Sequence, residues 1–334
     1  MKGLLAATAG FVLLGLRIAA QAAITIDTVG VSDAGNAPDT RYTTSGHGAV
    51  DYNYNVGKYE VTAAQYTAFL NAVAKSDTYS LYHTNTWGVS YACGIQRSGS
   101  PGSYSYGVAA DLANRPVNWV SYWDCCRFAN WLGNGQRTGF QDASTTERGA
   151  YTLDGYNGTD GRTIQRNAGW KWAVTSEDEW YKAAYYKGGG TDAGYWDYPT
   201  SSDTRPGRDM GDASGNNANW NDAGMNLLPI DSGKYTTVAG EFQNSHSPYG
   251  AFDQGGNLWE WNEALVTDTF RGYRGGSFYD GGYSLQASSS GGINDPTKAT
   301  PLVGFRVSSI PEPSSATALA GALLSFLGLR RRKA

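Results

Sequence analysis

The chain has little cysteine, histidine or positive charge. Its 334 residues include three cysteines and three histidines, and acidic residues outnumber basic ones by 30 to 26. The sequence contains no CxxC pair and no HExxH motif, and its histidines are far apart, so we expect no zinc site. The formal net charge of -4 provides no basic field for a phosphate backbone, which argues against nucleic acid as a partner.

The cysteines are Cys93, Cys125 and Cys126, an odd number for a chain that carries an export signal. One disulfide, from Cys93 to either of the other two, would be compatible with an oxidising compartment and would leave one buried thiol. Three free thiols are equally compatible with the sequence, so both alternatives stay open.

Charged residues make up only 17% of the chain, whereas glycine (44), tyrosine (23) and tryptophan (11) are frequent. This composition favours a turn-rich, irregular fold packed by aromatic side chains over a helical bundle. The motifs described below are spread through one continuous span, which favours a single large domain.

Three segments carry signals for the start of a helix. Thr62 is followed three residues later by Gln65, which makes a capping box and predicts a helix with an apolar stripe. Ser121 is the expected N-cap of a second helix. Thr175 and Ser176 are expected to start a third, with Asp178 and Glu179 placed for capping. All three are interpreted as helices that pack on the core.

The segment 76–113 has no sustained hydrophobic period and is rich in tyrosine, serine and glycine, which predicts a long surface loop. Its aromatic side chains either line a ligand groove or pack within the loop. They are Tyr79, Tyr82, Tyr91, Tyr104 and Tyr106.

Three short motifs lie between Pro248 and Val307. The first, GGNLWEW, is a glycine turn followed by a segment in which Trp259 and Trp261 alternate as on a strand. The second, RGGSF, begins at Arg274, and the third is GFRV. Both are interpreted as short strands that are entered through glycine and buried by an aromatic residue.

These motifs, in this order, resemble the formylglycine-generating-enzyme (sulfatase-modifying factor) family. Segments Val56–Leu70, Arg115–Leu132 and Thr175–Gly189 extend the resemblance over most of the chain. The resemblance implies a domain at residues 24–310 with an irregular, loop-rich α+β fold related to the C-type lectin architecture. Short antiparallel strands and a few helices are expected.

In that family, two cysteines shortly after the GGS motif bind copper and oxidise a substrate cysteine. The matching positions here are Asp280 and, approximately, Leu285, and no cysteine occurs between Gly276 and Gly304. A carboxylate and an isobutyl group do not replace soft thiolate ligands, so copper is not expected. Ser277 and Arg274 match the family pattern and are expected to hold the turn.

We therefore expect a binding module without catalytic activity, which presents aromatic side chains to a glycan or a peptide. The candidate ligand-binding residues are Trp259, Trp261, Arg274 and Asp280. Two alternatives stay open: an oxidoreductase of the formylglycine-generating class or a diverged activity that uses Asp280, and a purely structural matrix protein.

The family also has a calcium site, which makes calcium a candidate cofactor. By rough alignment the matching residues are Asn219, Trp220 through its carbonyl, and Asp231. Oxygen ligands suit a hard cation. Asparagine, aspartate and glycine also form ordinary loops, so a self-capped loop without an ion is the alternative.

Both ends of the chain carry targeting signals. Residues 1–23 combine Lys2, an apolar run and small residues, which is typical of a cleaved secretory signal. Residues 311–334 begin with Pro-Glu-Pro, continue with an apolar run and end in a basic cluster, and they resemble the PEP-CTERM sorting signal of Gram-negative bacteria. This predicts transient inner-membrane association, recognition by envelope sorting machinery, and a final location in the periplasm, on the outer surface or in the extracellular matrix.

Overall fold

The structure is a computed structural model that describes residues 23–211, 215–221, 230–231, 233–267, 269–289 and 291–311. The expected secretory signal, apart from Ala23, lies outside these residues, and so does the expected sorting segment after Pro311. In the described ranges, no helix is both long and apolar enough to cross a membrane.

The described strands form two four-stranded sheets and a separate hairpin. The first sheet has the order β1 (Thr28–Val31), β2 (Tyr54–Gly57), β10 (Val307–Ser309), β5 (Trp172–Val174). The second has the order β8 (Gly292–Asn294), β7 (Arg271–Arg274), β6 (Trp259–Leu265), β9 (Val303–Phe305). The hairpin consists of β3 (Ile95–Ser98) and β4 (Ser105–Val108).

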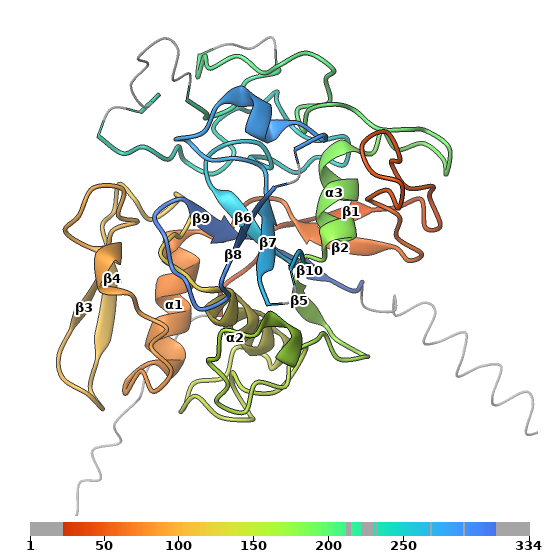
Figure 1. Ribbon diagram of the computed structural model, residues 1–334. Coiled ribbons are helices and arrows are strands. Elements are labelled where there is room, and N and C mark those ends of the chain that lie inside the picture. Colours follow the sequence, from red (N-terminus) through yellow and green to blue (C-terminus); the bar gives the residue numbers. More distant parts are fainter. Residues whose placement is uncertain are drawn as a thin grey trace, which may run out of the picture.

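The two sheets lie next to each other because the last two strands of the chain, β9 and β10, belong to different sheets and only Arg306 separates them (Figure 1). The sequence predicted one short strand through this GFRV motif, whereas the structure divides it in two. All the strand pairs among the described residues are antiparallel except β6 and β9, which pair in parallel. That pair joins Trp261 to Phe305.

Three helices begin where the sequence predicted. They are α1 (Ala63–Val73), α2 (Tyr122–Gly133) and α3 (Glu177–Tyr185). Each has a complete capping box, in which the N-cap hydroxyl and the side chain three residues later cap each other's backbone N–H groups. Short 3-10 turns occur at η1 (Thr84–Thr86), η2 (Gly161–Thr163) and η3 (Gly282–Leu285). The expected irregular α+β fold is confirmed.

Aromatic side chains pack α1 and α2 against the second sheet. The ring of Phe128 lies 5.3 Å from Phe69 and 5.4 Å from Phe305, perpendicular to both. Cys125 and Cys126 are fully buried beside them, and Cys93 is 4% exposed in the same core. All three are free thiols in the structure. The main core therefore lies between these two helices and the central strands, and the loops between α3 and β6 lie above it in Figure 1.

The tyrosines of the segment 76–113 are held largely by packing. The guanidinium of Arg97 lies over the rings of Tyr82 (4.7 Å) and Tyr104 (4.3 Å). Tyr106 is buried, and its hydroxyl donates to the carbonyl of Ala74. These contacts favour loop packing over a groove lined by these rings.

Candidate ligand-binding site

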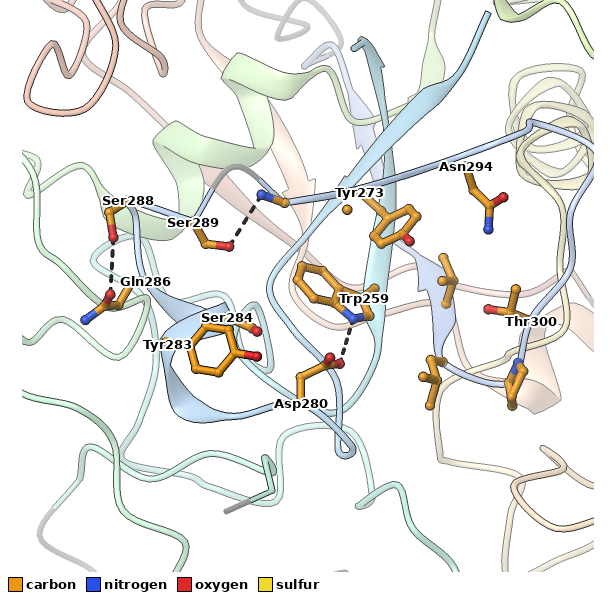
Figure 2. Close-up of a pocket in the computed structure, with 15 residues that line it drawn as sticks. Trp259, Tyr273, Asp280, Tyr283, Ser284, Gln286, Ser288, Ser289, Asn294 and Thr300 are labelled. Carbon is orange, nitrogen blue, oxygen red and sulfur yellow. Dashed lines mark hydrogen bonds between the residues drawn. The ribbon is translucent and has the colours of Figure 1, made fainter. Parts of the chain in front are cut away.

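A cavity of about 810 Å³ lies over the second sheet (Figure 2). Its floor is made by β6 and β7, and its walls come from the chain around η3, from β8 and from the segment that leads into β9. The lining residues are Trp259, Tyr273, Asp280, Tyr283, Ser284, Gln286, Ser288, Ser289, Gly291, Gly292, Asn294, Thr300, Pro301, Leu302 and Val303. Four separate segments thus build one open pocket, which we call the Trp259 pocket.

Two aromatic rings form the floor. Trp259 on β6 and Tyr273 on β7 meet edge to face, with ring centroids 5.3 Å apart. Trp261 is the next residue on the same face of β6, but it is fully buried and donates from its indole nitrogen to the carbonyl of Val120 at 3.1 Å. Trp259 therefore lines the pocket, while Trp261 belongs to the core below it.

The carboxylate of Asp280 holds the Trp259 indole in place (Figure 2). Its Oδ2 atom accepts hydrogen bonds from Trp259 Nε1 (2.7 Å), from the backbone N–H of Ser277 (3.1 Å) and from the Ser277 hydroxyl (2.5 Å). The Asp280 N–H donates back to the Ser277 carbonyl at 3.1 Å, which closes a turn. No described residue donates to Asp280 Oδ1, so one carboxylate oxygen remains for a ligand.

The other polar groups of the pocket are neutral. Hydroxyl and amide side chains line its walls: Ser284, Gln286, Ser288, Ser289, Asn294 and Thr300. Asp280 is the one acidic residue among the described lining residues, and none of those residues is basic. Tyr283, which is 72% exposed, adds an aromatic ring at the edge. The pocket thus combines aromatic faces with many hydrogen-bonding groups and little charge.

Comparison with known proteins identifies the domain. Residues 26–309 match the family model described as the sulfatase-modifying factor enzyme 1-like domain. The chain belongs to this family.

Three solved structures are similar to the chain at low identity. CarF is 21% identical, with a TM-score of 0.49, over 86% of this chain and 99% of CarF. Variable protein 1 of Treponema denticola is 17% identical, with a TM-score of 0.47, over 85% and 95% of the two chains. PvdO from Pseudomonas aeruginosa is 17% identical, with a TM-score of 0.44, over 85% and 91%. No curated protein matches the chain.

The two positions that match the cysteines of the sulfatase-modifying factor family have different surroundings. Asp280 lies in the pocket, as described above. Leu285 is fully buried and packs in an apolar cluster with Tyr198, Ala218 and Trp220. The Leu285 side chain is therefore packed inside this cluster and does not line the Trp259 pocket.

Arg274 of the RGGSF motif is 3% exposed and lies behind the pocket wall. Its guanidinium donates to Glu177 and to the carbonyl of Ser289, and lies 5.1 Å from the ring of Tyr181. It lines a neighbouring cavity of about 370 Å³ and not the Trp259 pocket. Arg274 thus fixes the segment around Ser289 from the far side.

The residues that match the family's calcium site form hydrogen bonds and an ion pair with other residues of the chain. Asn219 donates to the carbonyl of Tyr235 (2.8 Å) and to Asn257 (3.1 Å), while its Oδ1 atom is buried without a hydrogen bond to a described residue. The Trp220 carbonyl accepts from Arg208 Nε at 2.5 Å, and Asp231 pairs with Arg115.

An orphaned amide oxygen at Asn219 suits a cation, but the other two oxygens are each engaged by an arginine. Residues 222–229 and 232, in the same loop, lie outside the described ranges. Calcium at this loop stays a prediction, and the positive charges of Arg208 and Arg115 beside the Trp220 carbonyl and Asp231 Oδ2 disfavour it.

Several pocket residues were not predicted from the sequence, among them Tyr273, Tyr283, Gln286, Asn294 and Thr300. Tyr273 lies opposite Trp261 in the β6–β7 register, a pairing that the sequence alone does not show. The others lie in or directly after η3, on the short edge strand β8 and in the segment before β9, whose positions depend on the whole fold.

Proposed function

We propose that the chain is a binding module without catalytic activity, and that it binds a glycan in the Trp259 pocket. The observation that carries the proposal is a pocket floor of two aromatic rings, of which Trp259 is 8% exposed and hydrogen-bonded to Asp280, among neutral hydroxyl and amide groups. Sugar rings present flat apolar faces that pack on aromatic rings, and hydroxyls that exchange hydrogen bonds with such groups. A peptide would gain less from these walls, because they offer few apolar pockets for its side chains.

The state of the thiols supports the non-catalytic part of the proposal. Oxidation by copper needs accessible thiolates. Burial raises the pKa of Cys93 to about 11, and it raises the pKa of Cys125 well above its ordinary value. These thiols lie in the main core, and the carboxylate at the first family position is tied to Trp259 and Ser277.

The decisive experiment is a binding screen of the purified domain against neutral and acidic oligosaccharides and against unrelated peptides. A glycan should bind, and Trp259→Ala should weaken it by about tenfold or more because the stacking surface is lost. Trp87→Ala is the matched control, since Trp87 is 42% exposed and lies outside the pocket. Binding confined to peptides, or equal binding by Trp259→Ala, would refute the glycan assignment.

Two further variants test the edge of the pocket. Tyr283→Ala should weaken glycan binding, whereas Tyr279→Ala should not, because Tyr279 is 60% exposed but does not line the pocket. Copper, oxygen and a sulfatase-motif peptide should yield no aldehyde with the wild-type protein. Aldehyde above a control without protein would restore the enzyme alternative.

We also propose that the module works outside the cytoplasm, anchored transiently during export. The sequences of residues 1–23 and 311–334 support this proposal. Mass spectrometry of the native protein should find a mature chain that begins near Ala23 and lacks the terminal basic cluster. A soluble cytoplasmic form that retains both ends would contradict it.

A further inference from the structure

Another cavity, of about 220 Å³, lies at the start of α2. The segment 297–301 contributes to both sites, since Thr297 and Ala299 line this cavity and Thr300 and Pro301 line the Trp259 pocket. The remaining lining residues are Tyr79, Ser80, His83, Ser121, Trp123, Asp124 and Asn157. We call it the Asp124 cavity, and nothing in the proposed glycan site depends on it.

Asp124 is the unusual member of this group, because it is 6% exposed and has no counter-ion among the described residues. Its Oδ2 atom accepts from the Ser121 N–H at 2.8 Å as part of the capping box. No described residue donates to its Oδ1 atom, although the side chain lines the cavity. The carboxyl group therefore presents Oδ1, which accepts no hydrogen bond from a described residue, to the cavity.

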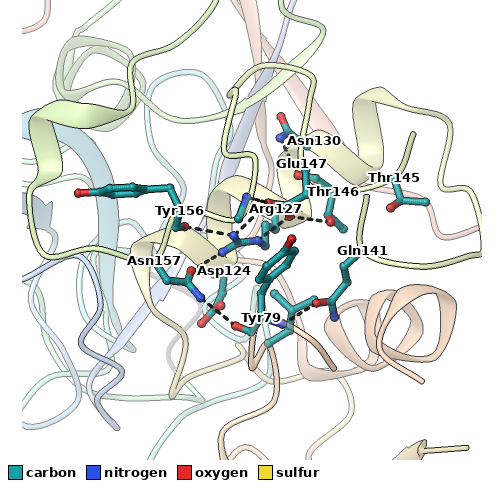
Figure 3. A network of polar contacts seen from close by, with 12 residues as sticks. Tyr79, Asp124, Arg127, Asn130, Gln141, Thr145, Thr146, Glu147, Tyr156 and Asn157 are labelled. Atoms are coloured by element: carbon teal, nitrogen blue, oxygen red, sulfur yellow. Dashed lines mark hydrogen bonds and ion pairs between the residues drawn. The ribbon is translucent and has the colours of Figure 1, made fainter. Parts of the chain in front are cut away.

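Arg127, one turn further along α2, is not the counter-ion of Asp124, because it is paired with Glu147 (Figure 3). Arg127 is fully buried and binds Glu147 through two hydrogen bonds of 2.7 and 3.1 Å. It also donates to Asn157 Oδ1 (2.7 Å) and to the Tyr156 carbonyl (3.1 Å), and its face lies 4.5 Å from the Tyr79 ring. The positive charge of Arg127 is thus paired with Glu147.

Two neighbours offer hydrogen-bond donors to the same space. His83 Nδ1 accepts from the Asn85 N–H at 3.2 Å, which places the ring proton on Nε2, and no described residue bonds that atom. Burial lowers the pKa of His83, which keeps the ring neutral at pH 7. Asn157 Nδ2 has only a long 3.5 Å contact with the Tyr79 carbonyl. A ligand oxygen in the cavity would find both groups available.

A carboxylate that is buried without a cation is costly, and a ligand cation would remove that cost. The other charged groups near it are Arg127, balanced by Glu147, and Asp77, paired with Arg97 at 3.3 Å. Burial raises the pKa of Asp124 to about 7, so the group can ionise at neutral pH when a cation arrives.

We propose that the Asp124 cavity binds a primary ammonium group, carried by an amino sugar or by a lysine-type side chain, in an ion pair with Asp124 Oδ1. A ligand oxygen accepts from His83 Nε2 or Asn157 Nδ2. At roughly 30 Å³ for each water, the cavity has room for one sugar ring or one such side chain.

The test is calorimetric titration of the full domain with glucosamine, N-acetylglucosamine and Nα-acetyl-lysine methylamide. At least one of the two amines should bind, and N-acetylglucosamine, which lacks the charge, should not. Glucosamine alone would assign the site to amino sugars, and the lysine derivative alone to peptides. Absence of binding by both amines, or equal binding of N-acetylglucosamine, would overturn the proposal.

Two further measurements locate the binding. Asp124→Asn should weaken amine binding by about tenfold or more, since a charge-assisted hydrogen bond is lost. Asp253→Asn, a change at another acid whose pKa burial raises to about 6, should leave it unchanged. Unchanged binding by Asp124→Asn would overturn the proposal.

If Asp124→Asn does not fold, ¹³C NMR of the wild-type aspartate carboxyls gives the answer. A saturating amine should lower the pKa of Asp124, and an unchanged pKa at saturation would refute the ion pair.

Discussion

Asp280 shows how one residue changes what a family site is suited to do. A thiol at this position would offer a soft ligand and a redox-active sulfur, whereas a carboxylate accepts hydrogen bonds. In this chain the carboxylate accepts from the Trp259 indole and from two groups of Ser277. It therefore fixes an aromatic ring at the floor of an open pocket.

Replacing Asp280 should accordingly affect binding and stability together. Asp280→Ala leaves the Trp259 N–H and the Ser277 turn without their acceptor, so we expect a loss of about 1–2 kcal/mol in the free energy of unfolding. Asp280→Asn keeps an acceptor oxygen and should lose less. Urea denaturation measures the stability, and glycan titration should show weaker binding for the alanine variant. Stability and binding both equal to the wild type would mean that Asp280 does not position Trp259.

Asp124 gives a prediction about pH. Burial raises its pKa from 3.8 to about 7 in the folded state, so the folded protein holds this proton more tightly than the unfolded chain does. The contribution of Asp124 to the free energy of unfolding is therefore fully present below about pH 4 and is lost as the pH rises to about 7. The loss amounts to at most about 4 kcal/mol.

Asp124→Asn removes this titration. Relative to the wild type, its free energy of unfolding should increase between pH 4 and pH 8, and the comparison at each pH cancels the groups that titrate in both proteins. Arg127, Glu147, Asp77 and His83, which surround the site, are unchanged by the substitution. Urea unfolding at both pH values gives the difference, and a difference that does not vary with pH would contradict the raised pKa.

At the scale of single elements, the helices were the most predictable part of the fold. Thr62 with Gln65, and Ser121, were identified from the sequence, and the structure confirms both N-caps. For the third helix the sequence indicated Thr175 and Ser176, and the structure has Ser176 as the N-cap with Glu179 as its partner. Capping depends on residues within one turn of each other, so the sequence alone contains the necessary signal.

The first cap can be tested directly. Thr62→Ala removes the acceptor of the Gln65 N–H and should lower the free energy of unfolding by about 1 kcal/mol. Thr62→Ser keeps the hydroxyl and serves as the matched control. Equal denaturation midpoints for the alanine and serine variants would show that this cap contributes nothing to stability.

The pocket was less predictable than the helices. Trp259 and Asp280 were named from motifs, but the residues that complete the pocket come from β7, β8 and two irregular segments. Trp261, an equal candidate by spacing, is buried because Tyr122 of α2 covers it, with ring centroids 6.0 Å apart. Which of the two alternating tryptophans lines the pocket depends on a helix more than a hundred residues away, and no local pattern shows that.

At the scale of the whole molecule, one buried ion pair connects the two sheets. Arg306, between β9 and β10, binds Glu260 of β6 through two hydrogen bonds of 2.5 and 2.6 Å. It also donates to the carbonyl of Gly57 at the end of β2 and to that of Phe252. The WEW and GFR motifs, which first indicated the family, thus contain the two halves of a structural contact.

A second buried glutamate, Glu60, lies beside this ion pair. Glu60 is 1% exposed, and burial together with the charge of Glu260 raises its pKa well above the ordinary value. It accepts hydrogen bonds from the Asn257 side chain and the Leu258 N–H. The raised pKa favours the neutral form of Glu60, which reduces its repulsion with Glu260 beside Arg306.

Removing the cation should therefore destabilise the whole domain more than any single change discussed above. In Arg306→Leu, Glu260 remains buried without its partner, so we expect a loss of about 3–5 kcal/mol in the free energy of unfolding. Adding Glu260→Gln removes the uncompensated charge and should recover part of that loss.

Urea unfolding followed by tryptophan fluorescence and by far-UV circular dichroism measures both variants. Because Arg306 bonds to both sheets, the two signals should lose their common midpoint in the single variant. A single variant as stable as the wild type, or a double variant less stable than the single one, would mean that packing alone joins the sheets.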